Sequence, residues 1–440
     1  MRNRIVMTMV CVVAALFLFS SLPDKPLQAQ QQKPAVTPTP AKPKPPKLTS
    51  HVVLISISGL RADHANAPKP FKLQIPNIQS LQAKGSHAVG IESVYPSQTI
   101  PAHVSMVTGM LPADHGVTSD FPFDEQTGLQ SATAFKSAKA IKSDTIWDAA
   151  KRADLITAAV GFPMTDKASI GFNFPEALDN SDTQKSETVI SLIEKHKPNL
   201  LFVNFTSFAR AQRRFGLLST ESKAALELID GLVGNIVMAI ERTKLTSETT
   251  FLIVSDHGAS KVEHEFRPNV LLAKKGFLTT DNQGNIKSWR AVVQSFDGSA
   301  AIFLKNPKDE STASELEKLF TAVEEKDSDN PLWRITTRRE AARLGADPRP
   351  AIFLDAAPSF QISARANGST ISKTDDRSAS GYLPSRAELR ATLIISGKAI
   401  KTGQKIEYGR LIDIAPTISR LLGLEMKTSR GRVFSEVIAQ

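Results

Sequence analysis

Thr99 is the hydroxyl residue of this chain that is best placed for nucleophilic chemistry. It stands directly before Ile100-Pro101, and the following residues up to Met106 are compatible with a helix. A threonine at an N-cap with proline in the first turn is typical of a helix start, where unpaired N–H groups and the positive end of the helix dipole favour an anion. A phosphoryl oxygen would be stabilised there. The simpler interpretation is that Thr99 only caps its helix.

Asp256 and His257 form a second pair with chemical potential, in the sequence Ser255-Asp256-His257-Gly258. They follow an apolar run at residues 251–254, which predicts a strand. Neighbouring carboxylate and imidazole groups at a strand end are suited to holding a metal ion. The alternative is a hydrogen-bonded aspartate beside an ordinary histidine.

Five apolar runs predict the strands that position these residues, at 52–57, 155–160, 200–205, 251–254 and 393–395. Helical patterns separate them, and the clearest covers residues 219–242 after a serine/threonine start. Continuous apolar strands between amphipathic helices predict an α/β fold with a mainly parallel sheet sandwiched by helices. Sites in such folds lie at the carboxyl ends of the strands, so residues that follow different strands should converge on one cleft.

The order of short motifs along the chain is more specific than any single motif. In addition to the segments around Thr99 and Asp256, it comprises Ser58-Gly59, residues 108–117, Gly381-Tyr382-Leu383-Pro384 and residues 413–417. This order resembles the alkaline phosphatase superfamily, in its type I phosphodiesterase/nucleotide pyrophosphatase branch, over nearly everything after residue 49. The resemblance implies an alkaline phosphatase-like fold with a smaller inserted cap region, and it puts the nucleophile of phosphate-ester hydrolysis at Thr99. It argues against the sulfatase relatives, which need Cys or Ser in a C/S-x-P-x-R arrangement.

The resemblance also implies two zinc ions, held by six side chains besides the threonine. Two of these ligand positions are retained, as Asp256 and His257. The other four carry residues that do not suit zinc and are degenerate: Ser58, Ala209, Arg213 and Ser380. Serine is a poor neutral ligand for zinc, and an arginine cation in the cleft would repel a metal. We therefore expect zinc to be weakly bound or absent.

Arg213 permits more than one interpretation. Its guanidinium could neutralise Asp256 after the loss of the metals, or it could bind a phosphate bidentately, which makes Arg213 the candidate for anion binding. Alternatively, Arg210, Arg213 and Arg214 form a solvated run on the surface.

The domain organisation follows from composition. Residues 1–29 have a positive start, an apolar run and a small residue before a cleavage point, and we interpret them as a signal peptide. Residues 30–48 are a Pro/Lys/Gln-rich linker, and residues 49–440 are the phosphodiesterase domain, with the likely cap insertion within 262–379. We expect export to the periplasm or the extracellular space, or a membrane anchor if the apolar run is not cleaved. The only cysteine, Cys11, lies in that run.

The net charge of +10 says little about nucleic acids. Seven basic residues against one aspartate in residues 1–48 account for +6 of it. The basic linker at residues 30–48 can therefore lie near an anionic membrane or wall polymer. No specific nucleic-acid binding is expected.

Three functions remain open from the sequence. The first is a secreted pseudoenzyme that lacks most zinc ligands and binds an anionic or phosphorylated small molecule. The second is an active phosphate-ester hydrolase with Thr99 as nucleophile and a reduced metal site. The third is a surface scaffold on the proline-rich tether, with no ligand in the cleft.

Overall fold

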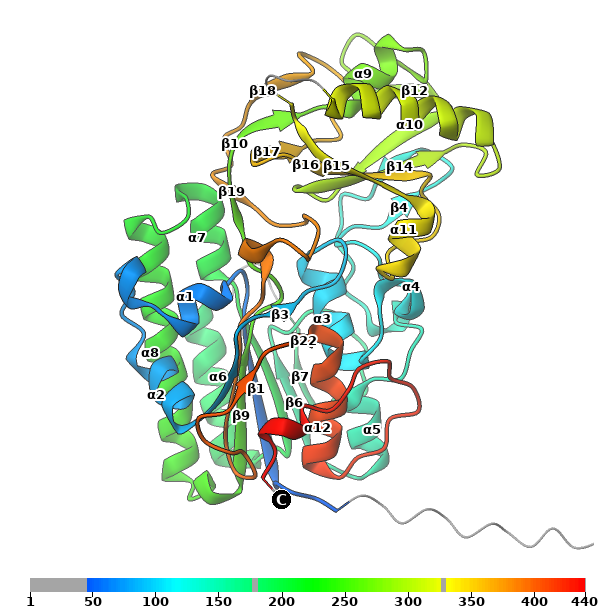
Figure 1. Ribbon diagram of the computed structural model, residues 1–440. Coiled ribbons are helices and arrows are strands. Elements are labelled where there is room, and N and C mark those ends of the chain that lie inside the picture. The colour runs from blue at the N-terminus through cyan, green and yellow to red at the C-terminus, as the bar shows by residue number, and fades with distance from the viewer. Residues whose placement is uncertain (1–45, 176–180, 326–329, 440) are drawn as a thin grey trace, which may run out of the picture. The chain divides into compact units, whose positions relative to one another are not determined.

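The computed structural model describes residues 46–175, 181–325 and 330–439, which belong to one compact unit (Figure 1). The expected signal peptide at 1–29 and most of the linker at 30–48 lie outside the described residues, so both remain predictions. Within the described ranges, none of the helices combines the length and the apolar character that crossing a membrane requires.

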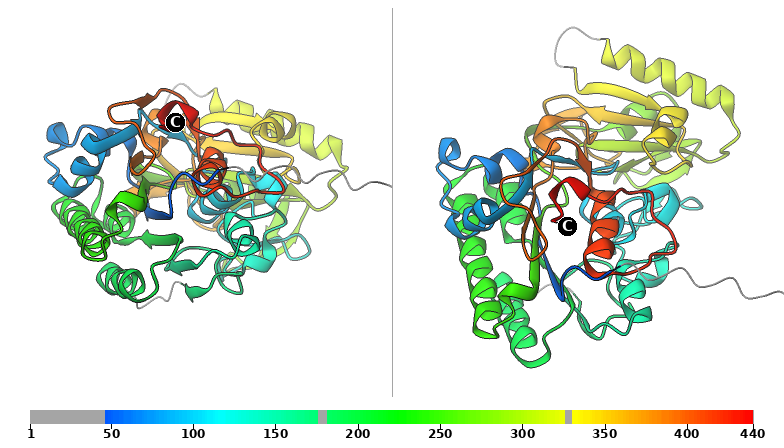
Figure 2. Two further views of the ribbon diagram at one scale, coloured as in Figure 1. Left: turned by 90° about the horizontal axis from the view of Figure 1, so that it is seen from below. Right: turned by 60° about the horizontal axis from the view of Figure 1, so that its bottom comes forward.

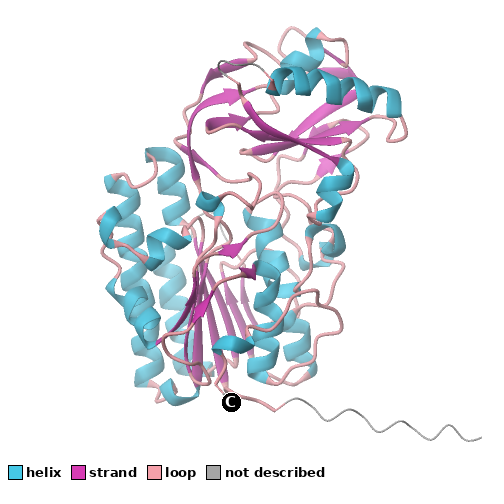
Figure 3. Cartoon of the chain, viewed as in Figure 1, coloured by secondary structure: helices cyan, strands magenta, loops and turns pink. Residues whose placement is uncertain are grey.

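An eight-stranded sheet forms the centre of the structure, with the strand order β21-β2-β20-β9-β1-β8-β6-β7 (Figure 3). The strands are β1 (His51–Ile57), β2 (Gly85–Ala88), β6 (Thr157–Val160), β7 (Phe172–Phe174), β8 (Leu200–Phe205), β9 (Thr249–Val254), β20 (Leu393–Gly397) and β21 (Lys405–Ile406). The five strands from β9 to β7 pair in parallel, whereas β20 runs antiparallel to β9. All five strands expected from the sequence lie in this sheet, which confirms the predicted fold class.

Helices cover both faces of the sheet (Figures 1 and 2). Alternate residues of β1 point to opposite layers. Val53 and Ile55 pack with residues of α2 (Pro76–Lys84), α6 (Asp182–His196) and α8 (Thr220–Arg242). Val52 and Leu54 pack with residues of α3 (Thr99–Thr108), α5 (Ile146–Arg152) and α12 (Ile414–Leu422). Burial of each such side chain stabilises the fold by roughly 1.5–3 kcal/mol, and it explains why the strands are continuously apolar.

The helix expected at 219–242 is confirmed as α8. Ser219 is its N-cap, and the Ser219 side chain accepts a hydrogen bond from the amide of Ser222. The other elements of this part of the chain are short or lie at the cleft. They are α1 (Ala62–Asn66), β3 (Ile91–Glu92), α4 (Pro112–His115), β4 (Phe123–Asp124), β5 (Leu129–Gln130), α7 (Ser207–Phe215) and β22 (Gly409–Arg410).

A second group of elements, the cap, lies between β9 and β20 in the chain and has its own apolar core. Its main sheet is antiparallel, with the order β13-β14-β16-β15, and carries helices α10 and α11. The bounds are β13 (Ala291–Ser295), β14 (Ser299–Leu304), α10 (Glu310–Glu324), β15 (Leu332–Thr337), α11 (Arg338–Arg343) and β16 (Ile352–Ala356). In Figure 1 this group lies beyond the carboxyl ends of the parallel strands.

The remaining strands and helix of the cap complete its connection to the central sheet. They are β10 (Ser260–Phe266), α9 (Pro268–Lys274), β11 (Leu278–Thr280), β12 (Ile286–Trp289), β17 (Ser359–Ile362), β18 (Ile371–Lys373) and β19 (Ser378–Ala379). Strand β10 leaves the end of β9 and pairs with β17, β18 and β19.

The segment that follows β19 is packed tightly against the β13–β14 turn. The amide of Gly298 donates a hydrogen bond to the carbonyl of Ser380 (2.7 Å). Gly381 has a φ of +86°, and a Cβ atom on it would stand 1.7 Å from the carbonyl oxygen of Phe296. Only glycine combines this backbone conformation with this close approach.

We expect Gly381→Ala to lower the free energy of unfolding more than Gly276→Ala does. Both glycines have positive φ, but a Cβ on Gly276 would meet nothing within 4 Å. The left-handed conformation costs both variants about 1–2 kcal/mol, and displacing the Phe296 carbonyl should cost Gly381→Ala a further 1–3 kcal/mol or so. Urea unfolding of the two variants measures the difference, and equal losses would contradict the tight packing.

Candidate functional site

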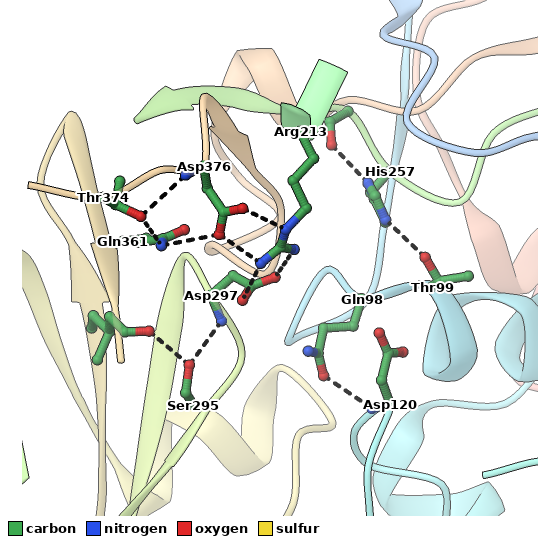
Figure 4. Close-up of polar contacts among 12 residues, drawn as sticks. Gln98, Thr99, Asp120, Arg213, His257, Ser295, Asp297, Gln361, Thr374 and Asp376 are labelled. Carbon is green, nitrogen blue, oxygen red and sulfur yellow. Dashed lines mark hydrogen bonds and ion pairs between the residues drawn. The ribbon is translucent and has the colours of Figure 1, made fainter. Parts of the chain in front are cut away.

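The candidate site lies at the carboxyl ends of the parallel strands, as the sequence predicts, and Figure 4 shows three of its residues, Thr99, Arg213 and His257. Ser58 follows β1, Asp256 and His257 follow β9, and α7 follows β8. Thr99 is contributed by α3. The expected N-cap role of Thr99 is wrong, because the helix starts one residue earlier and Gln98 is the N-cap, with extended backbone angles. The Thr99 hydroxyl is therefore free of a capping bond and faces His257.

Thr99, His257 and Asp256 converge. Thr99 Oγ1 lies 3.3 Å from His257 Nε2, which lies 3.4 Å from Asp256 Oδ2. His257 Nδ1 lies 2.7 Å from the carbonyl oxygen of Gly258. Because a carbonyl only accepts, Nδ1 carries a proton, and in the neutral ring the lone pair of Nε2 faces the threonine hydroxyl.

Asp256 is fully buried. Its Oδ1 accepts hydrogen bonds from the amides of Gly59 (3.0 Å) and His257 (2.9 Å), whereas its Oδ2 has no hydrogen-bond partner of ordinary geometry among the described residues. Burial raises the pKa of this carboxyl, but the charges of His257 and His103, followed by the neighbouring Gly59 and Thr99, outweigh burial and hold the pKa below its usual value. Asp256 is therefore an anion that is only partly compensated.

The residues at three of the degenerate ligand positions contact other residues of the protein. Ser58 Oγ donates a hydrogen bond to Asn204 Oδ1 (3.1 Å). Ala209 packs on Gly59, where an added Cβ would lie 3.2 Å from the Cβ of Ala209. Ser380 contributes its carbonyl to Gly298 at the β13–β14 turn. Ser58 and Ala209 are thus brought together beside Asp256, as the resemblance implies.

Arg213 does not pair with Asp256, so that interpretation is corrected. Its guanidinium donates two hydrogen bonds to Asp297 (2.7 and 3.2 Å) and two to Asp376 (3.1 and 2.9 Å). The charge of Asp297, with a smaller contribution from Asp376, raises the pKa of Arg213 further above its ordinary value. Four of the five N–H donors of the guanidinium are used in these bonds, which leaves one donor for the predicted anion.

Asp120 occupies the position where the sequence predicted an external anion. Its Oδ1 accepts a hydrogen bond from the amide of Ile100 (2.7 Å), at the start of α3, and its own amide donates to Gln98 Oε1 (3.1 Å). Burial raises the pKa of Asp120 to about 6, against the lowering effect of the Ile100 amide. The positive end of this helix is therefore already matched by a carboxylate of the chain itself.

The residues present do not fit the two zinc ions of the resemblance. Thr99, Asp256 and His257 offer one carboxylate and one imidazole, and the positions of the other zinc carry Ala209, Arg213 and a serine. Among the described residues, there is no group of three or more His, Cys, Asp or Glu side chains that could hold a metal ion.

A pocket of about 380 Å³ opens beside Thr99. Its walls are mainly apolar, with Phe135 and Phe162 among them, and its charged residues are the cations Lys136 and Arg210 and the carboxylate Asp166. Neither cation forms an ion pair with another described residue. Among the described residues that line this pocket, cations therefore outnumber carboxylates by two to one.

Sequence reasoning missed the three carboxylates that decide the charge of the cleft: Asp120, Asp297 and Asp376. Asp297 had one usable signal, because Asp297-Gly298 is a turn dipeptide between two apolar runs. Asp120 and Asp376 lie in loops with no distinguishing pattern.

We expect Asp120→Asn to remove a pH-dependent loss of stability. A carboxyl whose folded pKa is raised from 3.8 to about 6 stabilises the fold only while it is protonated, and this contribution is lost as the pH rises through 6. The variant should gain stability relative to the wild type between pH 4 and pH 7, by about 3 kcal/mol at most. Urea unfolding across this range measures the gain, and parallel curves for the two proteins would contradict the raised pKa.

Comparisons with known proteins agree with this architecture. The family model for type I phosphodiesterase/nucleotide pyrophosphatase matches residues 52–383. An uncharacterized pyrophosphatase/phosphodiesterase of Schizosaccharomyces pombe is 27% identical over 222 residues, which are 48% of this chain and 44% of that protein. Human ectonucleotide pyrophosphatase/phosphodiesterase family member 1 is 24% identical over 223 residues, which are 48% of this chain and 24% of that protein. The chain thus spans less than half the length of these curated relatives.

Solved structures show the same fold. Murine ectonucleotide pyrophosphatase/phosphodiesterase 5 superposes with a TM-score of 0.71 at 18% identity and covers 88% of this chain and 100% of its own. An inactive variant of the murine protein in complex with AMP gives a TM-score of 0.72, also at 18% identity, over 89% of this chain and 100% of its own. Since the family model spans well over half of the sequence, the protein belongs to the type I phosphodiesterase/nucleotide pyrophosphatase family, a branch of the alkaline phosphatase superfamily.

Proposed function

We propose that this protein is an exported member of its family that has lost two-zinc catalysis and binds an organic anion in the pocket beside Thr99. The observation that carries the proposal is the state of the four degenerate positions. Ser58, Ala209, Arg213 and Ser380 bring no carboxylate or imidazole to the cleft, and two-metal phosphoryl transfer needs both ions in place.

The charges of the cleft decide where an anion binds. The guanidinium of Arg213 lies at the rim, where it is held by Asp297 and Asp376. Asp120 is buried, and the nearby charges of Asp297 and Asp256 add to the effect of burial in raising its pKa. Without metal ions, this part of the site repels a phosphate dianion. Among its described residues, the pocket beside Thr99 has two cations, Lys136 and Arg210, against the one carboxylate of Asp166. With its apolar wall, this excess of positive charge suits a flat or apolar organic group that carries a negative charge.

The proposal includes export of the protein from the cytoplasm. Residues 1–29 support it through their sequence alone, and the relatives include ectonucleotide enzymes and a venom phosphodiesterase of Crotalus adamanteus. The basic linker would keep the domain close to an anionic surface.

A second candidate function is hydrolysis of phosphate esters with a reduced metal site. It is favoured by the 3.3 Å approach of Thr99 Oγ1 to His257 Nε2 and by the Oδ2 atom of Asp256, which lies 3.4 Å from the same nitrogen. These groups keep a hydroxyl next to an acceptor for its proton.

Metal content and hydrolysis separate the two candidates. We expect the purified protein to contain substoichiometric zinc and to hydrolyse bis-p-nitrophenyl phosphate no faster than Thr99→Ala, because only one carboxylate and one imidazole remain at the ligand positions. Elemental analysis and initial rates measure both. Two zinc ions per chain, or turnover that depends on Thr99, would support the hydrolase instead.

Ligand binding is tested with AMP, which combines an aromatic base with a phosphate. AMP should raise the melting temperature in a saturable manner, and inorganic phosphate at the same concentration should have little effect, because the apolar wall contributes nothing to its binding. Arg210→Gln should reduce the AMP effect about tenfold or more in apparent affinity, as expected for loss of a charged hydrogen bond.

Arg214→Gln is the matched control, because Arg214 lies on the ring of Phe215 and does not line the pocket. Arg213→Gln should also leave AMP binding in place, since its fork is occupied by Asp297 and Asp376. An equal response of all variants, or no saturable effect of AMP, would favour the scaffold function.

A further inference from the structure

Three segments that are distant in the sequence meet at Arg213. The first is the end of α7, which carries Arg213. The second is the cap turn, residues 296–298, between β13 and β14. The third is the strap, residues 374–379, which runs from β18 into β19. Asp297 belongs to the cap turn and Asp376 to the strap, so the guanidinium contacts both (Figure 4).

The guanidinium is shared evenly by the two carboxylates. One edge, Nε and Nη2, donates to both oxygens of Asp376, and the other edge, Nη1 and Nη2, donates to both oxygens of Asp297. Two bidentate pairs on one planar group fix the direction of both aspartates as well as their distance. A lysine could supply the charge at this place but not the geometry.

The backbone of Asp297 and the carboxylate of Asp376 each have further hydrogen-bond partners besides Arg213. The amide of Asp297 donates to Ser295 Oγ (3.2 Å), and its carbonyl accepts from the amide of Ile362 (2.6 Å). Asp376 Oδ2 also accepts from Gln361 Nε2 (3.2 Å). Side chains that are already oriented lose less conformational entropy when the ion pairs form.

The main chain supports the same junction. The amide of Arg377 donates to the carbonyl oxygen of Arg213 (2.8 Å), so the strap is attached to the end of α7 through both backbone and side chain. The cap turn is in turn attached to the residue after the strap, because the amide of Gly298 donates to the carbonyl of Ser380. The three segments therefore form one closed circuit of contacts at the rim of the cleft.

We propose that Arg213, Asp297 and Asp376 form a latch that holds the strap and the cap turn on α7 and thereby fixes the rim of the cleft without a metal ion. Arg213 stands at one of the zinc-ligand positions implied by the family, and Ser380, at another, directly follows the strap. The latch joins α7 to the strap and to the cap turn through ion pairs. This inference does not depend on ligand binding or on the loss of hydrolysis.

The latch is accessible to salt. The side chain of Arg213 is 47% exposed and those of Asp297 and Asp376 are 31% exposed. Ion pairs at this exposure are weakened as ionic strength rises. A latch built from them responds to salt and not to chelators, which distinguishes it from a metal-held rim.

Hydrogen–deuterium exchange of the whole protein tests the latch. In Arg213→Gln, the amides of the strap and the cap turn should exchange about tenfold faster or more, because local opening exposes them. Amides of β1 should keep their rates. Arg214→Gln, the matched control next in the sequence, should exchange as the wild type does.

Exchange is also measured with added salt or EDTA and in a second Arg213 variant. In the wild type, about 0.5 M sodium chloride should speed exchange in the strap, whereas EDTA should not, and Arg213→Gln should no longer respond to salt. Arg213→Lys, a milder change for use if Arg213→Gln does not fold, should give rates between those of wild type and Arg213→Gln. Strap exchange that is equal in the Arg213 and Arg214 variants, or that rises with EDTA, would overturn the proposal.

Discussion

Compensation of negative charge at the carboxyl ends of the parallel strands is the constraint on which this cleft depends. A buried charge without a partner costs several kcal/mol. The aspartates of the cleft are compensated by different partners. Asp256 accepts from backbone amides and faces two imidazoles, Asp120 accepts from the start of α3, and Asp297 shares Arg213 with Asp376. Main-chain dipoles and one guanidinium thus supply the positive charge that metal ions supply in the family.

This constraint makes the replaced positions interdependent. An aspartate in place of Ala209 would stand on Gly59, whose amide already binds Asp256, and no cation would separate the two carboxylates. Ser58 and Ala209 are neutral and small, and they avoid that repulsion. Arg213 is cationic, but it is turned toward the cap and leaves the inner cleft acidic. The four positions therefore form one consistent charge pattern and not four independent losses.

Features of the structure that depend on residues close together in the sequence were predictable, whereas contacts between distant residues were not. Strands such as residues 200–205 and the helix at 219–242 were predictable because apolar spacing is a local signal. The convergence of Ser58 with Asp256 followed from their positions at the carboxyl ends of predicted strands, and the place of Thr99 beside them followed from the family resemblance. The N-cap of α3 was misplaced by one residue, since Gln98 caps the helix without a side-chain hydrogen bond and threonine is the more usual cap. The partners of Arg213 were not predictable, because Asp297 and Asp376 lie 84 and 163 residues away and no pattern links them to α7.

Fold and chemistry separate clearly in this chain. A TM-score of 0.71 at 18% identity shows that the backbone of the family is kept while most side chains differ, and function resides in the side chains of a site. The fold brings α7, the β13–β14 turn and residues 374–380 close to one another, and the ion pairs of Arg213 join them. A guanidinium at this position needs carboxylates within reach of its N–H groups, and Asp297 and Asp376 meet this condition.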